Sequence, residues 1–307
     1  MKEIEFGIKV PTLSEEGARG NTFVSQILQY IQDAQDTYRT IWVSDHLMPW
    51  VKGPKGDADA LECWTMMTYL AGVFKDLTLG SAVLCNSFRS PTLLAKMAAT
   101  FNTLTGGRLI LGIGAGWSEV EYNGYGYDFP SAPHRIRQLA EAVQIIKRMW
   151  TEDEVHFEGR YFNVRGARCY PRPDPHPPIM IGGSGEQLML RVVARYADWW
   201  NTHATTPKMV KHKMDVLRDH CSKVGRDFDS IKTTLEGFVA IAETEEEVKR
   251  ISSRGRRAHF AGTPEQVLDQ VTSYIDLGIE HFILRFLDQP RKDGAKLFAE
   301  KVIQQIT

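Results

Sequence analysis

The stretch TIWVSDH, Thr40 to His46, is a run of apolar β-forming residues that ends in a carboxylic acid and an imidazole. A continuous apolar run of this kind is typical of a strand that is buried on both faces. Seven other short runs along the chain have the same character. They are, in order, EFGIKVP, LTLGSAVLC, RLILGIG, PIMIGGSG, DWWNTHA, TTLEGFVAIA and EHFILRFLD. We interpret all eight as strands of one sheet.

Segments with the period of an amphipathic helix lie between these runs. Residues 133–150 repeat apolar side chains on one face, and residues 262–277 begin with a Thr-Pro-Glu sequence that is typical of a helix start. Alternating β and α units predict a parallel sheet, and eight of them predict a closed (β/α)8 TIM barrel, because an open doubly wound sheet seldom needs eight strands. We expect one α/β barrel domain over residues 1–307.

Three segments depart from the alternation and predict insertions. Residues 47–60 and 122–133 are expected to be loops at the C-terminal mouth of the barrel, where long loops often shape pockets. The sequence that follows the helix at 133–150 alternates apolar and polar residues around Glu158-Gly159, which predicts a β-hairpin.

The composition limits the classes of function. The chain has 307 residues, of which 43% are hydrophobic and 24% charged, and its formal net charge is -1, so a basic surface for nucleic acid is not expected. The sequence lacks a membrane-spanning apolar run and a secretory signal, which favours a cytoplasmic protein with a small-molecule substrate. The four cysteines form no CxxC pair, and we expect neither a structural zinc site nor a disulfide framework.

Asp45 and His46 follow the second predicted strand. Side chains that act on substrates in such barrels project from the C-terminal ends of the strands. His46 is therefore a candidate acid or base near neutral pH, and Asp45 is its candidate partner. An aspartate that caps the next loop and a histidine bonded to the backbone are an equally good interpretation of the same residues.

The third and fourth predicted strands also end in candidate binding residues. Asn86 could bond the edge of a ligand, although asparagine is common in any strand-to-helix turn. Gly112, Gly114 and Gly116 have the spacing GxGxG, and glycines permit the backbone to approach a flat ligand closely. The GxGxxG pattern of a dinucleotide site is absent, so we do not expect nicotinamide binding here.

The fifth predicted strand runs into Gly182-Gly183-Ser184-Gly185, ahead of a helical pattern. Exposed backbone amides, the hydroxyl of Ser184 and the positive end of a helix together predict a phosphate cradle. A tight βα turn with Ser184 as the helix cap explains the same residues. In barrels, phosphate sites more often follow strands seven and eight.

The chain resembles the bacterial-luciferase-like family, and in particular its F420-dependent oxidoreductases, through four ordered segments. They are WVSDHL, LGSAVLCNSFRSPTLLAKMAATFNTLTGGRLILGIGAGWSEVEYNGYGYDFP, RIRQLAEAVQIIKRMWTEDEVHFEGRYF and PPIMIGGSGE. The resemblance implies a barrel mouth that holds coenzyme F420 or FMN, with the tricyclic ring inside and the phosphate near Gly183. It also implies that Asp45 bonds near the ring and that His46 faces the substrate.

The family resemblance also bears on the backbone, the substrate and the assembly of the protein. A non-prolyl cis peptide is expected behind the ring, at Ala82-Val83 in the third strand. Relatives that use sugar phosphates carry a glutamate directly after the glycines of strand four, where this chain has Trp117, so the same substrate is not expected. Members of the family usually form dimers or larger homo-oligomers, and we expect one here.

We therefore expect an enzyme that transfers a hydride between C5 of the deazaflavin coenzyme F420 and a small organic substrate. One alternative is an FMN-dependent luciferase-like monooxygenase that uses reduced flavin and O2. Another is a non-catalytic flavin or deazaflavin carrier, for which His46 would be dispensable. The candidate catalytic residues are His46 and Asp45, no metal is expected, and the candidate cofactor-binding residues are Asp45, Ala82, Val83, Asn86, Gly114, Gly116, Gly182, Gly183, Ser184 and Gly185.

Overall fold

The computed structural model describes residues 3–14, 18–49, 58–253 and 257–306. Parallel strands form a closed ring in the order β1-β2-β3-β5-β8-β9-β10-β12, and β12 pairs again with β1. These strands are β1 (Glu5–Lys9), β2 (Thr40–Val43), β3 (Thr78–Ser81), β5 (Leu109–Gly114), β8 (Ile179–Gly182), β9 (Trp199–His203), β10 (Lys232–Ile241) and β12 (His281–Phe286). The ring confirms all eight predicted strands and the TIM barrel.

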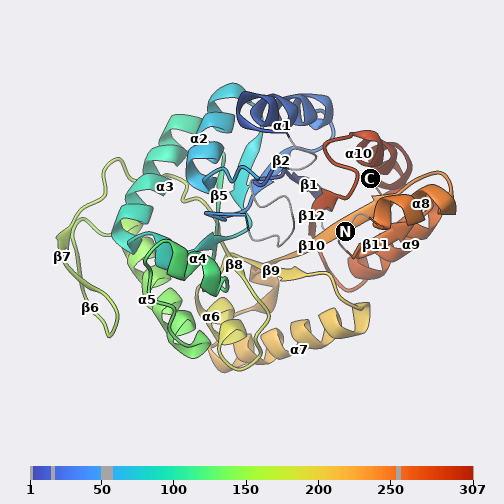
Figure 1. Cartoon of the computed structure of the whole chain (residues 1–307). Helices are drawn as coiled ribbons and strands as arrows, with labels where there is room; N and C mark the ends of the chain where they lie inside the picture. Colours follow the sequence, from blue (N-terminus) through green and yellow to red (C-terminus); the bar gives the residue numbers. More distant parts are fainter. Residues whose placement is uncertain (1–2, 15–17, 50–57, 254–256, 307) are drawn as a thin grey trace.

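Helices surround the ring of strands (Figure 1). They are α1 (Gly20–Ala34), α2 (Cys63–Val73), α3 (Pro91–Thr105), α5 (Ala132–Thr151), α6 (Met189–Tyr196), α7 (Pro207–Lys223), α8 (Glu245–Ser252), α9 (Pro264–Ile275), α10 (Asp293–Phe298) and α11 (Gln304–Ile306). The predicted helices at 133–150 and 262–277 are confirmed as α5 and α9, and a capping box between Thr263 and Gln266 opens α9. Among the described residues, no helix is long and apolar enough to cross a membrane.

Aromatic and aliphatic side chains fill the interior of the barrel. One interior cluster consists of Trp42, Ala82, Ile110, Met180 and Ile283. Glycine at position 7 leaves room for the indole of Trp42, because a Cβ there would lie 2.5 Å from its Nε1 atom. The same Nε1 donates a hydrogen bond of 3.2 Å to buried His281. The interior below the mouth is therefore a packed core, which leaves ligand binding to the strand ends.

The insertions were predicted in part. The antiparallel pair β6 (Val155–Glu158) and β7 (Asn163–Ala167) confirms the hairpin. The segment 122–133 was wrongly predicted to be entirely loop, because it begins within α4 (Glu119–Gly124) and ends within α5. Part of the predicted loop 47–60 lies outside the described residues.

Short elements occur at two strand ends. β4 (Leu84–Cys85) continues the line of β3 and pairs with β5, and a 3-10 turn at Asn86–Phe88 follows it. β11 (Phe260–Gly262) pairs in parallel with the last residues of β10, beyond the part of β10 that pairs with β9. Two further turns are a 3-10 turn at Phe228–Ser230 and a π-helical turn at Ala299–Ile303.

Candidate active site

The C-terminal mouth of the barrel contains a cavity of about 1530 Å³, a volume that includes its open entrance. Each strand of the ring contributes lining residues, either from the strand or from the loop directly after it. The lining includes eight of the candidate residues from the sequence, and they come from the ends of four different strands. These residues are Asp45, His46, Ala82, Val83, Gly114, Gly116, Gly182 and Gly183.

Val83 and two glycines form one wall of this cavity. The Ala82-Val83 peptide bond is cis, as the family resemblance implied. A Cβ at Gly114 would lie 2.8 Å from Cγ2 of Val83, and a Cβ at Gly182 would lie 3.0 Å from its Cγ1. Because both positions are glycine, the valine side chain fits between the strand ends and closes the wall. The result is an apolar surface that suits the face of a flat ring.

His46 lies at the mouth, next to a glutamate that the sequence did not connect with it. Its Nδ1 atom lies 3.2 and 3.1 Å from the two carboxylate oxygens of Glu121, which is in α4. The backbone amide of Leu47 donates a 2.7 Å hydrogen bond to the same carboxylate. The side chain of His46 keeps 17% of its surface exposed, whereas that of Glu121 keeps 2%. A buried carboxylate therefore holds a partly exposed imidazole, the geometry of an oriented acid or base.

The charge of Glu121 is stabilised by these contacts. Burial alone would raise the pKa of Glu121, but the hydrogen bond and the charge of His46 and the amide of Leu47 outweigh it and hold the pKa below its usual range. The carboxylate is thus ionised near neutral pH. An ionised partner at Nδ1 fixes the orientation of the imidazole ring.

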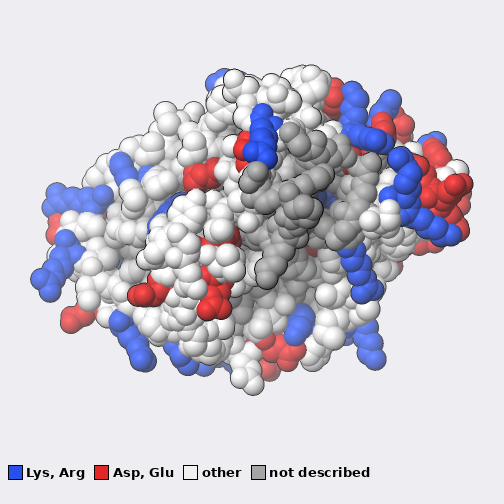
Figure 2. All heavy atoms as spheres, viewed as in Figure 1, with Lys and Arg blue, Asp and Glu red and all other residues white. Residues whose placement is uncertain are grey.

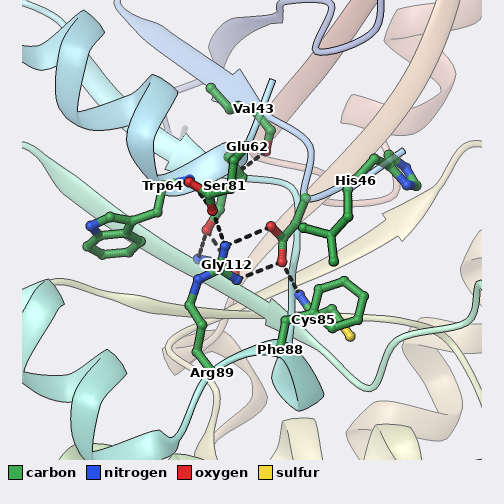
Figure 3. Close-up of polar contacts among 12 residues, drawn as sticks. Val43, His46, Glu62, Trp64, Ser81, Cys85, Phe88, Arg89 and Gly112 are labelled. Atoms are coloured by element: carbon green, nitrogen blue, oxygen red, sulfur yellow. Dashed lines mark hydrogen bonds and ion pairs between the residues drawn. The ribbon is translucent and has the colours of Figure 1, made fainter. Parts of the chain in front are cut away.

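Asp45 lies beside His46 in sequence, but its carboxylate is directed elsewhere. Arg89 binds both oxygens, with Nη1–Oδ2 and Nη2–Oδ1 distances of 2.8 and 2.9 Å, and the amide of Cys85 donates a third bond of 2.8 Å. Arg89 also pairs with Glu62, the residue that caps α2. Figure 3 shows Arg89, Glu62 and Cys85 close together, with the imidazole of His46 pointing away from them.

The side chain of Asp45 is fully buried in this network. Three hydrogen bonds occupy both of its carboxylate oxygens, so they already satisfy the group that was expected to bond near the ring. The geometry favours the alternative weighed for this residue, an aspartate that fixes the loop after its own strand. The ion pair raises the pKa of Arg89, in spite of the opposing effect of burial, and keeps the guanidinium charged.

A second buried ion pair, which the sequence analysis did not predict, lies in another wall of the cavity. Nζ of Lys9 lies 2.5 Å from a carboxylate oxygen of Glu236 and donates a 3.0 Å hydrogen bond to the carbonyl of Ala82. Burial alone would raise the pKa of Glu236, but the charge of Lys9 holds it below its usual range. The sequence contains one signal for this pair: Lys9 and Glu236 are charged residues inside two strand runs that are otherwise mainly apolar.

The Gly182–Gly185 loop differs from the predicted cradle in two respects. Helix α6 begins at Met189, so the loop does not cap the helix directly, because a turn at residues 186–188 separates them. The amide of Gly183 already donates a 3.0 Å bond to the carbonyl of Asn201. Gly183 has a φ of 127°, a conformation that glycine adopts readily. The amides of Ser184 and Gly185 are the remaining candidates for a phosphate, and that role stays a prediction.

Asn86 is buried at the start of the turn after β4, and it does not line the cavity. Its Nδ2 atom has no hydrogen-bond partner among the described residues. The preceding residue, Cys85, does line the cavity. No group of histidine, cysteine and acidic residues suited to a metal ion occurs in the described part of the chain.

The chain is similar in sequence to enzymes that are named as F420-dependent. The chain is 27% identical over 304 residues to an F420-dependent glucose-6-phosphate dehydrogenase of Microbacterium testaceum, a match that covers 88% of this chain and 89% of that protein. A protein of the same name from Nocardia farcinica is 28% identical over 298 residues, with 82% and 87% covered.

Solved structures share the fold. An F420-dependent secondary alcohol dehydrogenase, solved with an F420-acetone adduct, superimposes with a TM-score of 0.83 at 18% identity and covers 98% of both chains. An EDTA monooxygenase from Chelativorans has a TM-score of 0.83 at 16% identity, with 99% of this chain and 94% of that chain covered. The sequence profile of the luciferase-like monooxygenases matches residues 4–261. The chain therefore belongs to the luciferase-like monooxygenase family.

Proposed function

We propose that this protein is a coenzyme F420-dependent oxidoreductase that transfers a hydride between C5 of the deazaflavin and a small organic substrate. The observation that carries the proposal is the pairing, in one cavity, of an apolar wall at Val83 with the His46–Glu121 dyad. The relatives that align over most of their length support F420 over FMN, because they are named as F420-dependent enzymes.

The cavity fits a tricyclic coenzyme. Ala82, Val83, Gly114 and Gly182 would hold the face of the ring, because the two glycines leave no side chains between the ring and Val83. Gly116 shapes the next turn with a φ of 74°.

The outer end of the coenzyme is assigned to the loop after β8. The amides of Ser184 and Gly185 would bind its phosphate, and Gly183 would keep the loop close to β9 through its bond to Asn201. Asn86, which directly follows the cavity-lining Cys85, is kept as the candidate for a bond to the edge of the ring, because its Nδ2 atom has no partner among the described residues.

His46 is the catalytic residue that we assign to proton transfer. Bound F420 supplies the hydride acceptor or donor at C5. Glu121 accepts a hydrogen bond from Nδ1 of His46, which makes Nε2 the ring nitrogen that exchanges a proton with the substrate. When a hydride reaches a carbonyl or activated double bond, His46 donates the proton that neutralises the neighbouring atom. In the opposite direction it accepts that proton.

Asp45 is a positioning residue in this proposal. It ties the loop after β2 to Arg89 and to the amide of Cys85, and His46 extends from that fixed loop. The bidentate ion pair restricts the backbone directly before the imidazole. The ion pair of Asp45 thus fixes the backbone before His46, and Glu121 fixes its imidazole ring.

A titration of the purified protein with each cofactor tests the function. We expect F420 to bind at least about tenfold more tightly than FMN, because F420 extends beyond its phosphate into an acidic tail that offers contacts FMN lacks. The measurement is the change in cofactor fluorescence at low and moderate salt. Tighter binding of FMN, with oxygen consumption when reduced flavin is supplied, would replace the proposal by a monooxygenase.

We also propose the setting in which the enzyme works. Residues 1–307 act as one domain and assemble as a homo-oligomer, as is usual among the family members that the sequence resembles. The four cysteines are buried and free, which suits the reducing cytoplasm. The net charge of -1 supports the expectation that nucleic acid is not a partner. Light scattering after size-exclusion chromatography tests the assembly.

A further inference from the structure

Trp117 is an exposed aromatic side chain next to the proposed proton donor. It lines the cavity, yet 63% of its surface is exposed. Its ring centroid lies 6.0 Å from that of His46, with an angle of 80° between the planes. The indole therefore places a large apolar face at the point where the substrate must meet the imidazole.

Among the described residues, exposed apolar side chains continue from Trp117 along α4. On α4, the side chain of Val120 is 62% exposed, and Tyr125 directly after the helix is 54% exposed. Figure 2 shows mainly uncharged and acidic atoms over the position of α4. Further inside, the apolar lining continues with Leu13, Leu84, Phe88, Met189 and Phe238. These side chains offer apolar surface to a neutral molecule that has an apolar face.

The charged groups of the cavity are arranged unfavourably for an anion. Lys9 lies against Glu236, and the two carboxylates Glu236 and Glu121 both have a lowered pKa and stay ionised. Arg285 is a further cation of the lining, 6.0 Å from the centroid of the Phe238 ring. A doubly charged phosphate would have to lose water beside two ionised carboxylates, which favours a neutral molecule over an anion in this cavity.

From these observations we propose that the substrate is a neutral, flat carbonyl compound with a conjugated or aromatic system, which packs against Trp117. This inference rests on the proposed function and names the substrate class of the same site. In the reduction, the hydride and its electron pair add to carbon, the displaced π electrons move to oxygen, and His46 protonates that oxygen. The reduced coenzyme is oxidised by two electrons in the same step.

Binding of two nearly isosteric probes tests the substrate class. Benzylideneacetone is a neutral conjugated ketone, and trans-cinnamate has the same ring and double bond with a carboxylate in place of the acetyl group. Each probe, and glucose 6-phosphate, is titrated calorimetrically into protein loaded with oxidised coenzyme, so that no turnover occurs. We expect benzylideneacetone to bind at least about tenfold more tightly than either anion. Equal or tighter binding of an anion overturns the proposal.

Variants of Trp117 locate the contact. Trp117→Ala should weaken benzylideneacetone binding about tenfold, and Trp117→Phe should restore most of it, because the phenyl ring keeps a stacking face. Leu104→Ala is the control, since Leu104 is 77% exposed on α3 and does not line the cavity. An unchanged affinity in Trp117→Ala would contradict the assignment.

Coenzyme affinity separates this proposal from the proposed function. All variants should bind F420 within about threefold of the parent protein. If FMN binds and F420 does not, the assignment of F420 as the coenzyme fails, and the same titrations with FMN-loaded protein still decide whether the site prefers a neutral or an anionic molecule.

Discussion

The cavity has two walls that each bury a glutamate beside a cationic partner, and the partners differ. On one wall Glu121 faces His46, whose side chain is 17% exposed. On the other, Glu236 faces Lys9, whose side chain is 10% exposed. An imidazole has two ring nitrogens, so one can bond the glutamate while the other exchanges a proton with a substrate, whereas a lysine ammonium group only donates hydrogen bonds. The same carboxylate chemistry therefore supports proton transfer on the first wall and structure on the second.

The two pairs also differ in the other contacts that Lys9 and His46 make. Lys9 donates to the carbonyl of Ala82 and so joins β1, β10 and the segment after β3. His46 extends from a loop and packs edge-on against Trp117. One pair is locked within the barrel, and the other is presented at its entrance.

The largest expected effect comes from breaking the structural pair. Lys9→Met leaves Glu236 buried without its cation and should lower the free energy of unfolding by about 3–5 kcal/mol, as found when one partner of a buried ion pair is removed. Urea denaturation measures this change. The double variant Lys9→Met/Glu236→Leu should recover a large part of the loss, because both charges are then absent. A single variant as stable as the parent would show that the pair is not structural.

The matched surface control is Lys211→Met. Lys211 pairs with Asp215 one turn away on α7, and both side chains are about half exposed. We expect a loss below about 1 kcal/mol, because solvent screens this pair.

The next effect concerns the catalytic wall. His46→Ala should lower kcat by about a hundredfold or more, through loss of the proton-transfer group, while F420 affinity stays within about tenfold. Steady-state kinetics and cofactor titration measure the two quantities. His156→Ala is the control, because His156 is an exposed histidine that pairs with Glu154 on the hairpin. Unchanged turnover in His46→Ala would favour the carrier, and equal losses in binding and rate would make His46 a cofactor anchor.

The smallest effect is expected for the partner of His46. Glu121→Gln keeps an acceptor oxygen but removes the charge, and kcat should fall about tenfold with a changed pH profile. Glu119→Gln, an exposed neighbour on α4, should leave kcat unchanged. A pH profile that matches the parent in Glu121→Gln would exclude the dyad.

The lowered pKa of Glu121 gives the sign of the pH dependence of stability. The folded pKa of Glu121 lies below its ordinary value of 4.5, so its contribution to stability is fully present above about pH 4.5 and is lost as the pH falls through the lowered pKa. Thermal melting between neutral and acidic pH should show a smaller acid-side loss in Glu121→Gln than in the parent.

The strands were predictable because their signal is local. Seven of the eight predicted runs contain their strand, and β10 begins one residue before its run; the run at residues 77–85 contains both β3 and β4. A strand buried on both faces is read from consecutive residues, without knowledge of its neighbours. The start of α6 was placed too early, because the helical period does not reveal the turn at residues 186–188.

The sequence predicted where the candidate site lies in the fold, but not how its side chains are arranged. The parallel barrel brings Asp45, His46, Gly114 and Gly183 to one mouth, as their positions at strand ends indicated. The direction of each side chain was not predictable. Asp45 and His46 are adjacent, yet one faces Arg89 and the other faces Glu121.

The amino-acid sequence by itself determined the strand segments, the barrel and the presence of an acid and an imidazole after β2. Only the tertiary structure decided the partners, because they lie far apart in the chain: 75 residues separate His46 from Glu121, and 227 separate Lys9 from Glu236. Closure of the ring sets these distances, and a buried charge then takes whichever opposite charge the closed ring brings within reach, since leaving it unpaired would cost several kcal/mol.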